Sequence, residues 1–200
     1  MAKLLLLRHA QIRANRQGRW HGSTDSALTW YGRRQVRRTA RHIAVAHAPV
    51  TAVYTSPLAR ARSTAERIAR GLGVPVDIHP DLREYAIGEW EGMRFSELAA
   101  QHRFVDVATR DLDFAPPGGE TLRQVAERMV AAIRTIHDRH GDDDRVLVVG
   151  HGASMAVALG AFIDGDPARW VDYHFANCSL TELMLSPAPY VNFFNNTQHL

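Results

Sequence analysis

The sequence predicts an α/β protein built as a three-layer α/β/α sandwich around a mostly parallel sheet. Short apolar runs typical of buried strands alternate with longer segments of helical periodicity along the 200 residues. Two of the runs, Lys3–Leu7 and Arg145–Gly150, are almost continuously apolar, as strands covered on both faces are. No internal repeat or low-complexity tract interrupts this alternation. We therefore expect one domain over residues 1–200.

Each predicted element rests on a local signal. Apolar or β-branched runs bounded by turn residues indicate strands, and apolar residues recurring at helical spacing indicate helices. The predicted strands are Leu4–Leu7, Ala52–Thr55, Val76–Ile78, Arg145–Val149, Ser179–Leu185 and Val191–Phe194. The predicted helices are Thr29–Ala48, Leu58–Gly71, Thr121 to about His140, and Ala153–Phe162, with Phe95–Thr109 helical in pieces.

A helix-breaking segment lies just past the middle of the sequence. The run Pro116-Pro117-Gly118-Gly119 cannot continue a helix, and Thr121 after it is a favourable N-cap for the next one. The region from about 85 to 119 lies before this break and interrupts the strand–helix alternation. We expect it to be an insertion that forms a lid over the sheet edge.

Composition limits the class of protein. The single cysteine cannot form an internal disulfide, and the first residues are too short for a signal peptide or a membrane span. We therefore expect a cytoplasmic protein with no membrane partner. The net charge is +3, and five arginines recur at helical spacing in the first long helix: Arg33, Arg34, Arg37, Arg38 and Arg41.

These arginines predict a solvated helix face. A nucleic-acid stripe and a steering field for an anionic substrate are the alternatives. Because no nucleic-acid motif or interleaved aromatic residue accompanies the arginines, no nucleic-acid partner is expected.

Two histidines follow apolar strands in matched contexts. His9, preceded by Arg8, ends the first run, and His151, followed by Gly152, ends the run at 145–150. Because ligand sites in α/β proteins lie outside the carboxyl ends of strands, both imidazoles could meet at one sheet edge. A cation and an imidazole there indicate an anion site with a nucleophile or proton carrier. The helix after Gly152 could also point its N-terminal amides at the anion.

Further charged residues lie near other strand ends. Arg60 falls in the first turn of the helix after the second strand, where a guanidinium suits a phosphate or carboxylate. Arg62 is expected on the solvated side of that helix. Glu84, Glu89 and Glu91 share a loop rich in glycine and aromatics, and one of them could be a general acid. Spacing alone does not choose among the three.

Several other chemistries lack a signal. The chain has no metal-ligand motif, no Gly-x-Ser-x-Gly elbow and no Walker A loop. A metal site therefore has little support.

Five motifs occur in register along the chain. They are Arg8-His9, Ser56-Pro57-Leu58-x-Arg60-Ala61, Leu82-x-Glu84 followed by Gly88-x-Trp90-Glu91-Gly92, Pro117-Gly118-Gly119-Glu120-Thr121, and Val149-Gly150-His151-Gly152. Together they resemble the histidine phosphatase superfamily, the phosphoglycerate mutase-like proteins. Each motif is weak alone, but five in family order from residue 3 to about 185 are highly specific.

The resemblance implies a role for each matching residue. His9 would attack phosphorus and become a phosphohistidine, while Arg8, Arg60 and His151 would hold the phosphoryl oxygens. Asn15, which matches the family's opening motif, would donate a further hydrogen bond to phosphate.

The resemblance also selects one of the three carboxylates. Glu84 matches the family's proton donor, which would protonate the leaving alkoxide and then activate the hydrolytic water. No metal or organic cofactor is implied, since arginines and histidines supply the positive charge. Residues expected against the phosphate or substrate are Gly152, His21 and Gly22, and those expected to wall the leaving-group pocket are Trp20, His21, Tyr85 and Trp90.

The implied function is a metal-independent phosphomonoesterase acting on a small phosphorylated metabolite. At 200 residues the chain is similar in length to the short phosphatase branch rather than to the longer 2,3-bisphosphoglycerate-dependent mutases. The Pro117-Gly118-Gly119-Glu120-Thr121 stretch also resembles that of small phosphatases such as alpha-ribazole phosphatase. A phosphoglycerate mutase and a weakly active module that binds a phosphorylated ligand are the alternatives. The second gains support from two departures: Ala10 replaces the family's glycine, and Ile12 replaces a threonine or serine.

Overall fold

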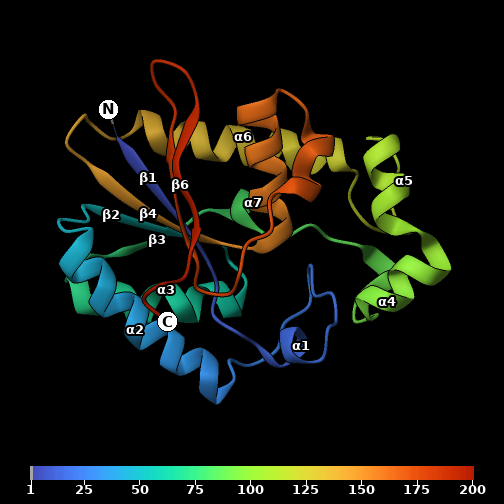
Figure 1. Cartoon of the computed structure of the whole chain (residues 1–200), viewed down its shortest axis with the longest axis horizontal. Coiled ribbons are helices and arrows are strands. Elements are labelled where there is room, and N and C mark those ends of the chain that lie inside the picture. Colours follow the sequence, from blue (N-terminus) through green and yellow to red (C-terminus); the bar gives the residue numbers. More distant parts are fainter. Residues whose placement is uncertain (1) are drawn as a thin grey trace.

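The computed structural model describes residues 2–200 and confirms the predicted three-layer arrangement. One six-stranded sheet lies between two helical layers (Figure 1). Its strands are β1 (Lys3–Arg8), β2 (Ala52–Thr55), β3 (Val76–Ile78), β4 (Arg145–Gly150), β5 (Leu180–Met184) and β6 (Tyr190–Asn196). All six predicted strands are present.

The strands run in the order β3-β2-β4-β1-β5-β6. The first four in this order are mutually parallel, whereas β5 is antiparallel to β1 and β6 is antiparallel to β5. The sheet is therefore mostly parallel with one antiparallel edge, as expected for an α/β protein.

Helices cover both faces of this sheet. They are α1 (Arg13–Arg16), α2 (Trp30–Ala46), α3 (Ala59–Leu72), α4 (Phe95–Glu97), α5 (Phe104–Arg110), α6 (Leu122–Asp138) and α7 (Gly152–Leu159). The side chains of Thr29 and Thr121 accept hydrogen bonds from backbone N–H groups in the first turns of α2 and α6, so both residues are N-caps. The cap at Thr121 is as predicted, whereas the helix predicted to begin at Thr29 begins one residue later.

The alternating residues of β1 show how the two cores form. Leu4 and Leu6 face a cluster with α6 and α7, while Leu5 and Leu7 face a second cluster with α2 and α3. All four side chains are fully buried. Because both faces are covered, a continuous apolar run is stable here where an alternating one would bury polar groups.

The carboxyl ends of the three central strands are aligned. Arg8 pairs with Gly150 across β1 and β4, and Thr55 pairs with Val149 across β2 and β4. The backbone N–H of His9 then donates to Gly150 at 3.0 Å, just beyond the last pair. Residues that directly follow these strands therefore meet at one sheet edge.

The region between β3 and α6 forms short helical pieces instead of a long helix. After the 3-10 turn η2 (Gly88–Trp90) come α4, the π-helical turn η3 (Leu98–His102) and α5, as predicted for Phe95–Thr109. Figure 1 shows these pieces at one end of the molecule, beyond the end of the sheet.

The predicted helix Ala153–Phe162 differs at both ends. It begins one residue earlier, at Gly152, and changes into a π-helical turn, η4 (Gly160–Asp164), before the 3-10 helix η5 (Pro167–Asp172). A Cβ at Gly160 would lie 2.8 Å from the carbonyl oxygen of Asp166, so the returning chain packs directly on this glycine. Within residues 2–200, no helix is long and apolar enough to cross a membrane.

Candidate active site

His9 lies at the carboxyl end of β1, where its side chain is 3% exposed. Nδ1 lies 2.8 Å from the backbone oxygen of Ala10. Because a carbonyl oxygen can only accept, Nδ1 carries the proton and Nε2 keeps its lone pair. Burial lowers the pKa of His9 well below 6.5, and the guanidiniums of Arg60 and Arg8 lower it further. The imidazole is therefore neutral and nucleophilic at neutral pH.

Arg8 ends β1, and its guanidinium lines the same cavity as His9. Nη1 donates to the backbone oxygen of Phe175, whereas Nε is buried without a partner. A Cβ at Gly152 would lie 3.2 Å from Arg8 Cζ, so the glycine leaves room for the guanidinium. Burial lowers the pKa of Arg8, and the carboxyl of Glu84 opposes that shift. Arg8 thus places a desolvated cation with an unused N–H beside His9.

Arg60 reaches the cavity from the first turn of α3 and is almost fully buried. Its Nη1 forms an ion pair with Asp25 Oδ1 at 2.9 Å, and its two Nη atoms donate to the carbonyl oxygens of residues 21, 22 and 24. Asp25 also accepts from the backbone N–H of Ala59 at 2.7 Å and so caps α3. Nε of Arg60 has no partner. Arg60 therefore anchors the 21–25 loop and keeps one N–H free.

His151 lies behind His9 and is not among the residues that line the cavity. The two ring centroids are 5.2 Å apart, and the rings meet edge-on. Nε2 of His151 lies 2.8 Å from Ser56 Oγ, while Nδ1 is buried without a partner. Burial lowers the pKa of His151 well below 6.5, with further lowering by Arg60, His9 and Arg8. In this arrangement a neutral His151 supports the His9 ring.

Glu84 lies in the loop after β3 and presents its carboxyl to the cavity beside the N-terminus of α7. Oε1 accepts from the backbone N–H of Ser154 at 2.7 Å and of Tyr85 at 2.9 Å, and Oε2 accepts from Ala153 at 3.1 Å. The expectation that the first amides of this helix face a bound anion is therefore wrong for Ala153 and Ser154. The loop that carries Glu84 packs against the helix end, and its carboxyl oxygens occupy these amides.

The structure separates the three carboxylates that spacing left equivalent. Glu84 lines the cavity, whereas Glu89 is exposed and does not. Glu91 accepts from the backbone N–H groups of Gly22 at 2.8 Å and Ser23 at 3.0 Å. Glu91 therefore shapes the loop below Arg60, and only Glu84 is placed to exchange a proton with a ligand.

Asn15 lines the cavity from α1. Its Oδ1 accepts from the backbone N–H of Ile12 and from Nδ2 of Asn177, both at 3.1 Å. Asn177 also donates to the backbone oxygen of His9 at 3.0 Å. Since the acceptor of Asn15 is in use, its NH2 group is what remains for a ligand.

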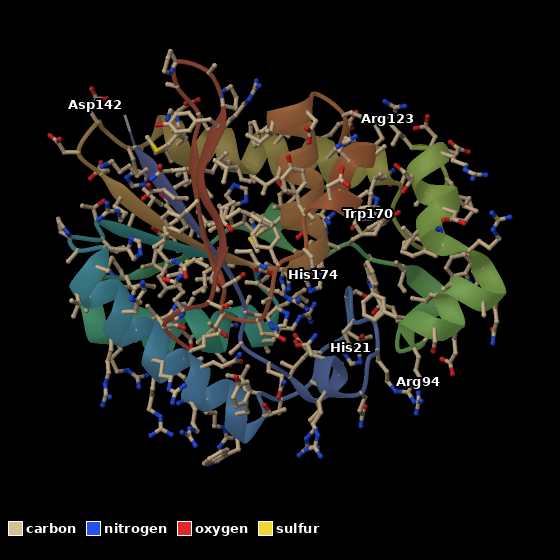
Figure 2. The ribbon with its side chains drawn as sticks, viewed as in Figure 1. His21, Arg94, Arg123, Asp142, Trp170 and His174 are labelled. Carbon is tan, nitrogen blue, oxygen red and sulfur yellow. The ribbon has the colours of Figure 1, made fainter. Side chains whose placement is uncertain are left out.

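These groups form the inner end of a cavity of about 510 Å³. The outer end is formed mainly by aromatic and aliphatic side chains, and Figure 2 shows Trp170, His174 and His21 around it. We define the outer end by these lining residues: Trp20, His21, Phe95, Val105, Ala156, Trp170, Val171, Tyr173 and His174, together with Arg19. Phe95 and Val105 come from the 85–119 region that we expected to act as a lid.

Two of the expected aromatic walls lie elsewhere. Tyr85 is fully buried and packs edge-on against Trp20, with ring centroids 6.0 Å apart. Trp90 stacks on His102 at 4.0 Å. Both line the core beside the cavity because the loop from 81 to 93 folds inward. Trp20 and His21 do line the cavity, as expected.

Gly22 is not a lining residue. A Cβ on it would collide with the carbonyl oxygen of Tyr85 and would lie 2.5 Å from Glu91 Oε1. Its carbonyl oxygen also accepts from Arg60 at 2.8 Å. The glycine is therefore explained by close packing of two loops below Arg60.

The two departures from the family pattern occupy different places. Ala10 is fully buried in the apolar cluster under the site, its backbone is outside the positive-φ region, and its N–H donates to Thr64 Oγ1 at 3.2 Å. Its methyl group does not line the cavity. Ile12 does line it and presents an apolar side chain there.

Sequence reasoning missed three residues that hold this site in place: Asp25, Ser56 and Asn177. Asp25 had a usable signal, since it is the only Asp or Glu in residues 1–65, a stretch with twelve Lys and Arg. Ser56 belonged to a quoted motif, but nothing local connected it to His151. Asn177 had no local signal at all.

Several unused polar atoms belong to residues of the cavity. Within residues 2–200, twelve buried side-chain polar atoms lack a hydrogen-bond partner; Arg8 Nε, Arg60 Nε, His21 Nδ1 and Trp170 Nε1 are on lining residues, and His151 Nδ1 is on the ring behind His9. Such atoms are costly unless a ligand satisfies them, and converging guanidinium N–H groups suit an oxyanion. In the same part of the chain, no group of three or more His, Cys, Asp or Glu side chains could hold a metal ion.

Known proteins share this architecture. The bifunctional protein Rv2228c of Mycobacterium tuberculosis is 34% identical over 206 residues, an alignment that covers 99% of this chain but 55% of that protein. The chain thus spans about half the length of this relative. Phosphoserine phosphatase from Entamoeba histolytica, solved with 3-phosphoglyceric acid, is 26% identical with a TM-score of 0.87 over 100% of both chains.

A second solved structure is similar to this chain over almost its whole length. Mycobacterial glucosyl-3-phosphoglycerate phosphatase, solved with VO3, is 26% identical with a TM-score of 0.87, covering 98% of this chain and 99% of that one. The model of the histidine phosphatase superfamily (branch 1) matches residues 4–196. The chain therefore belongs to the histidine phosphatase superfamily.

Proposed function

We propose that the protein is a phosphoric monoester hydrolase that dephosphorylates a small metabolite through a phosphohistidine at His9, without a metal ion. The observation that carries the proposal is His9 with Nδ1 bonded to the Ala10 carbonyl oxygen and Nε2 left free, in one cavity with two guanidiniums that each keep a buried N–H unused. The phosphatases of similar structure, named for phosphoserine and glucosyl-3-phosphoglycerate, support small phosphorylated metabolites as the substrate class.

In the first step, Nε2 of His9 forms a bond to phosphorus as the bond from phosphorus to the leaving oxygen breaks. Arg8 and Arg60 offset the charge on the phosphoryl oxygens, and the Asn15 NH2 group donates to one of them. Glu84 gives its proton to the leaving oxygen, so that an alcohol departs rather than an alkoxide.

In the second step, water attacks the phosphorus of the phosphohistidine. Glu84, now a carboxylate, takes a proton from this water, and the bond between nitrogen and phosphorus breaks. Inorganic phosphate and neutral His9 result. Since Glu84 regains the proton that it lost, one ester and one water yield one alcohol and one phosphate per turnover.

Neighbouring residues position these groups. Asn177 and Ala10 hold the backbone and ring of His9, and His151 with Ser56 supports the ring from behind. The guanidinium Nε atoms of Arg8 and Arg60, which line the cavity, are available to a ligand that enters beside His9.

The proposal is tested by trapping the intermediate. After a rapid quench with p-nitrophenyl phosphate, wild type should carry acid-labile phosphate and should remain active in EDTA. His9→Ala should lose the trapped phosphate and at least about 10³-fold in kcat. His47→Ala, which changes a histidine at the end of α2, is the matched control and should behave as wild type.

Two results would overturn this mechanism. One is turnover by His9→Ala at the wild-type rate, and the other is loss of activity in EDTA that added metal restores. Tight phosphate binding without any phosphate release would instead favour the binding module considered above.

A further inference from the structure

Several large apolar side chains at the outer end of the cavity are exposed to solvent. Residues 2–200 contain nine large apolar side chains that are solvent-exposed, and three of them line this one cavity. They are Phe95 at 52% exposure, Val105 at 39% and Val171 at 49%. Single exposed apolar residues are common, but a group of them around a concave site indicates ligand contact.

These three residues come from separate segments. Phe95 belongs to α4, Val105 to α5 and Val171 to η5, and none of these elements is part of the sheet. Behind them, Trp20 contacts Phe95 at a centroid distance of 5.4 Å and Trp170 at 6.4 Å. The outer end is therefore a wide apolar surface with an aromatic floor, large enough for a ring.

Polar groups are a minority at this end. Nη1 of Arg19 donates to the carbonyl oxygen of Gly92 at 2.6 Å, and the hydroxyl of Tyr173 donates to Asp164 at 2.8 Å, which leaves the other N–H groups of Arg19 and the exposed ring of His174 for a ligand. Glu84 is the single acid among the residues that line the cavity, so an ammonium group would find no second carboxylate.

Two buried nitrogens do remain without a partner here, His21 Nδ1 and Trp170 Nε1. Burial lowers the pKa of His21, with further lowering by Arg60, so this ring is a neutral hydrogen-bonding group. The wall therefore offers a few hydrogen-bonding groups within a mainly apolar surface.

We propose that the leaving group is a ring-sized, mainly apolar alcohol, so that the substrate is an aryl or arylalkyl phosphomonoester rather than a phosphorylated sugar, amino acid or glycerate. The proposal rests on the proposed function. It follows from the cavity itself, because an apolar group placed against Phe95, Val105 and Val171 removes their exposed surface from water.

A matched pair of esters tests this substrate class. 3-Phenylpropyl phosphate and propyl phosphate release primary alcohols of similar acidity, so their kcat/KM ratio reports the contact made by the ring. We expect a ratio of about ten or more, since burying a ring of this size against an apolar wall is strongly favourable. 3-Phosphoglycerate should also be hydrolysed less efficiently than the phenylpropyl ester. Equal kcat/KM for the two matched esters, or a preference for 3-phosphoglycerate, would overturn the proposal.

Variants of the wall locate the effect. Phe95→Ser should reduce the kcat/KM ratio of the two esters roughly fivefold, and Val171→Ser roughly threefold. Val45→Ser is the matched control, because Val45 is 87% exposed on α2 and does not line the cavity. Its ratio should equal that of wild type. An unchanged ratio in both wall variants would show that these side chains do not select the substrate.

The two proposals fail in different ways. If none of the esters releases phosphate, the proposed function is wrong. If both matched esters are hydrolysed through His9 with equal efficiency, the function stands and only the apolar leaving group is rejected.

Discussion

The inner and outer ends of the cavity are built on opposite principles. The inner end is polar, largely buried and formed where β1, β2 and β4 finish in register. The outer end is apolar, partly exposed and formed by short helical pieces outside the sheet. Under the proposed function, the phosphoryl group is the same in every substrate, whereas leaving groups differ. The comparison then predicts that the rigid sheet edge carries the shared chemistry and that the short helical pieces outside the sheet carry selectivity.

The two ends also differ in how their side chains are held. At the inner end each functional group has a second contact that orients it, as Asp25 does for Arg60 and the α7 amides do for Glu84. The outer end relies mainly on packing, with hydrogen bonds at Arg19 and Tyr173. Changes at the inner end should therefore reduce all activity, while changes at the outer end should redistribute it among substrates.

The largest effect is expected from Arg60→Ala. The variant should lose roughly 10²–10³-fold in kcat/KM, because it removes a cation that faces the phosphoryl oxygens. The loss should be equal for phenylpropyl and propyl phosphates. Arg62→Ala is the matched control, since Arg62 is solvated and pairs only with Glu66, at 3.4 Å.

The thermal stability of Arg60→Ala should be measured together with its kinetics. The variant also loses the bonds to the 21–25 loop, so its Tm should fall while that of Arg62→Ala changes little. A kinetic loss that differs between the two esters by more than threefold would break the proposed division of the cavity.

A smaller and more selective effect is expected from Glu84→Gln. Alkyl esters should lose roughly 10–10²-fold in kcat, because their alkoxides need a proton to leave. p-Nitrophenyl phosphate, whose leaving group needs none, should lose much less in the first step. Glu89→Gln, in the same loop but exposed, is the control. Equal losses for good and poor leaving groups would reject the acid role of Glu84.

The smallest effect is expected on lowering the pH. The pKa of His9 is held well below 6.5 by burial and by the two arginines, and the neutral ring is the form that attacks. Activity should therefore persist as the pH falls through 6.5 and should be lost only when His9 takes up a proton at lower pH. The profile of kcat/KM from pH 8 to 4, corrected for titration of the substrate phosphate, should be the same for both esters. An acid limb centred at 6.5 or higher would contradict it.

Local patterns predicted most of the fold. Continuous apolar runs identified β1 and β4, and the capping threonine identified the start of α6, because burial on two faces and N-capping leave short-range marks in sequence. The boundary errors occur where tertiary contacts intervene. The helix after His151 changes to a π-helical turn because the chain folds back onto Gly160.

Strand ends and family motifs predicted the positions of His9, Arg8, Arg60 and Glu84 at the cavity, since parallel strands deliver their carboxyl ends to one edge. The residues that contact these side chains could not be predicted from the sequence. Asn177 contacts His9 across 168 positions, and Ser56 contacts His151 across 95. Contacts at such separations have no periodicity or spacing that a single sequence could display.

The sequence by itself thus determined the layers, the sheet edge and the family to which the chain belongs. Only the tertiary structure decided that Glu84 occupies the first amides of α7, that Ala10 turns into the core, and that Phe95, Val105 and Val171 meet around one opening. The physical reason is the range of the forces involved. Strand and helix patterns record burial of neighbours in the chain, whereas a cavity wall is made by side chains that only the packed fold brings together.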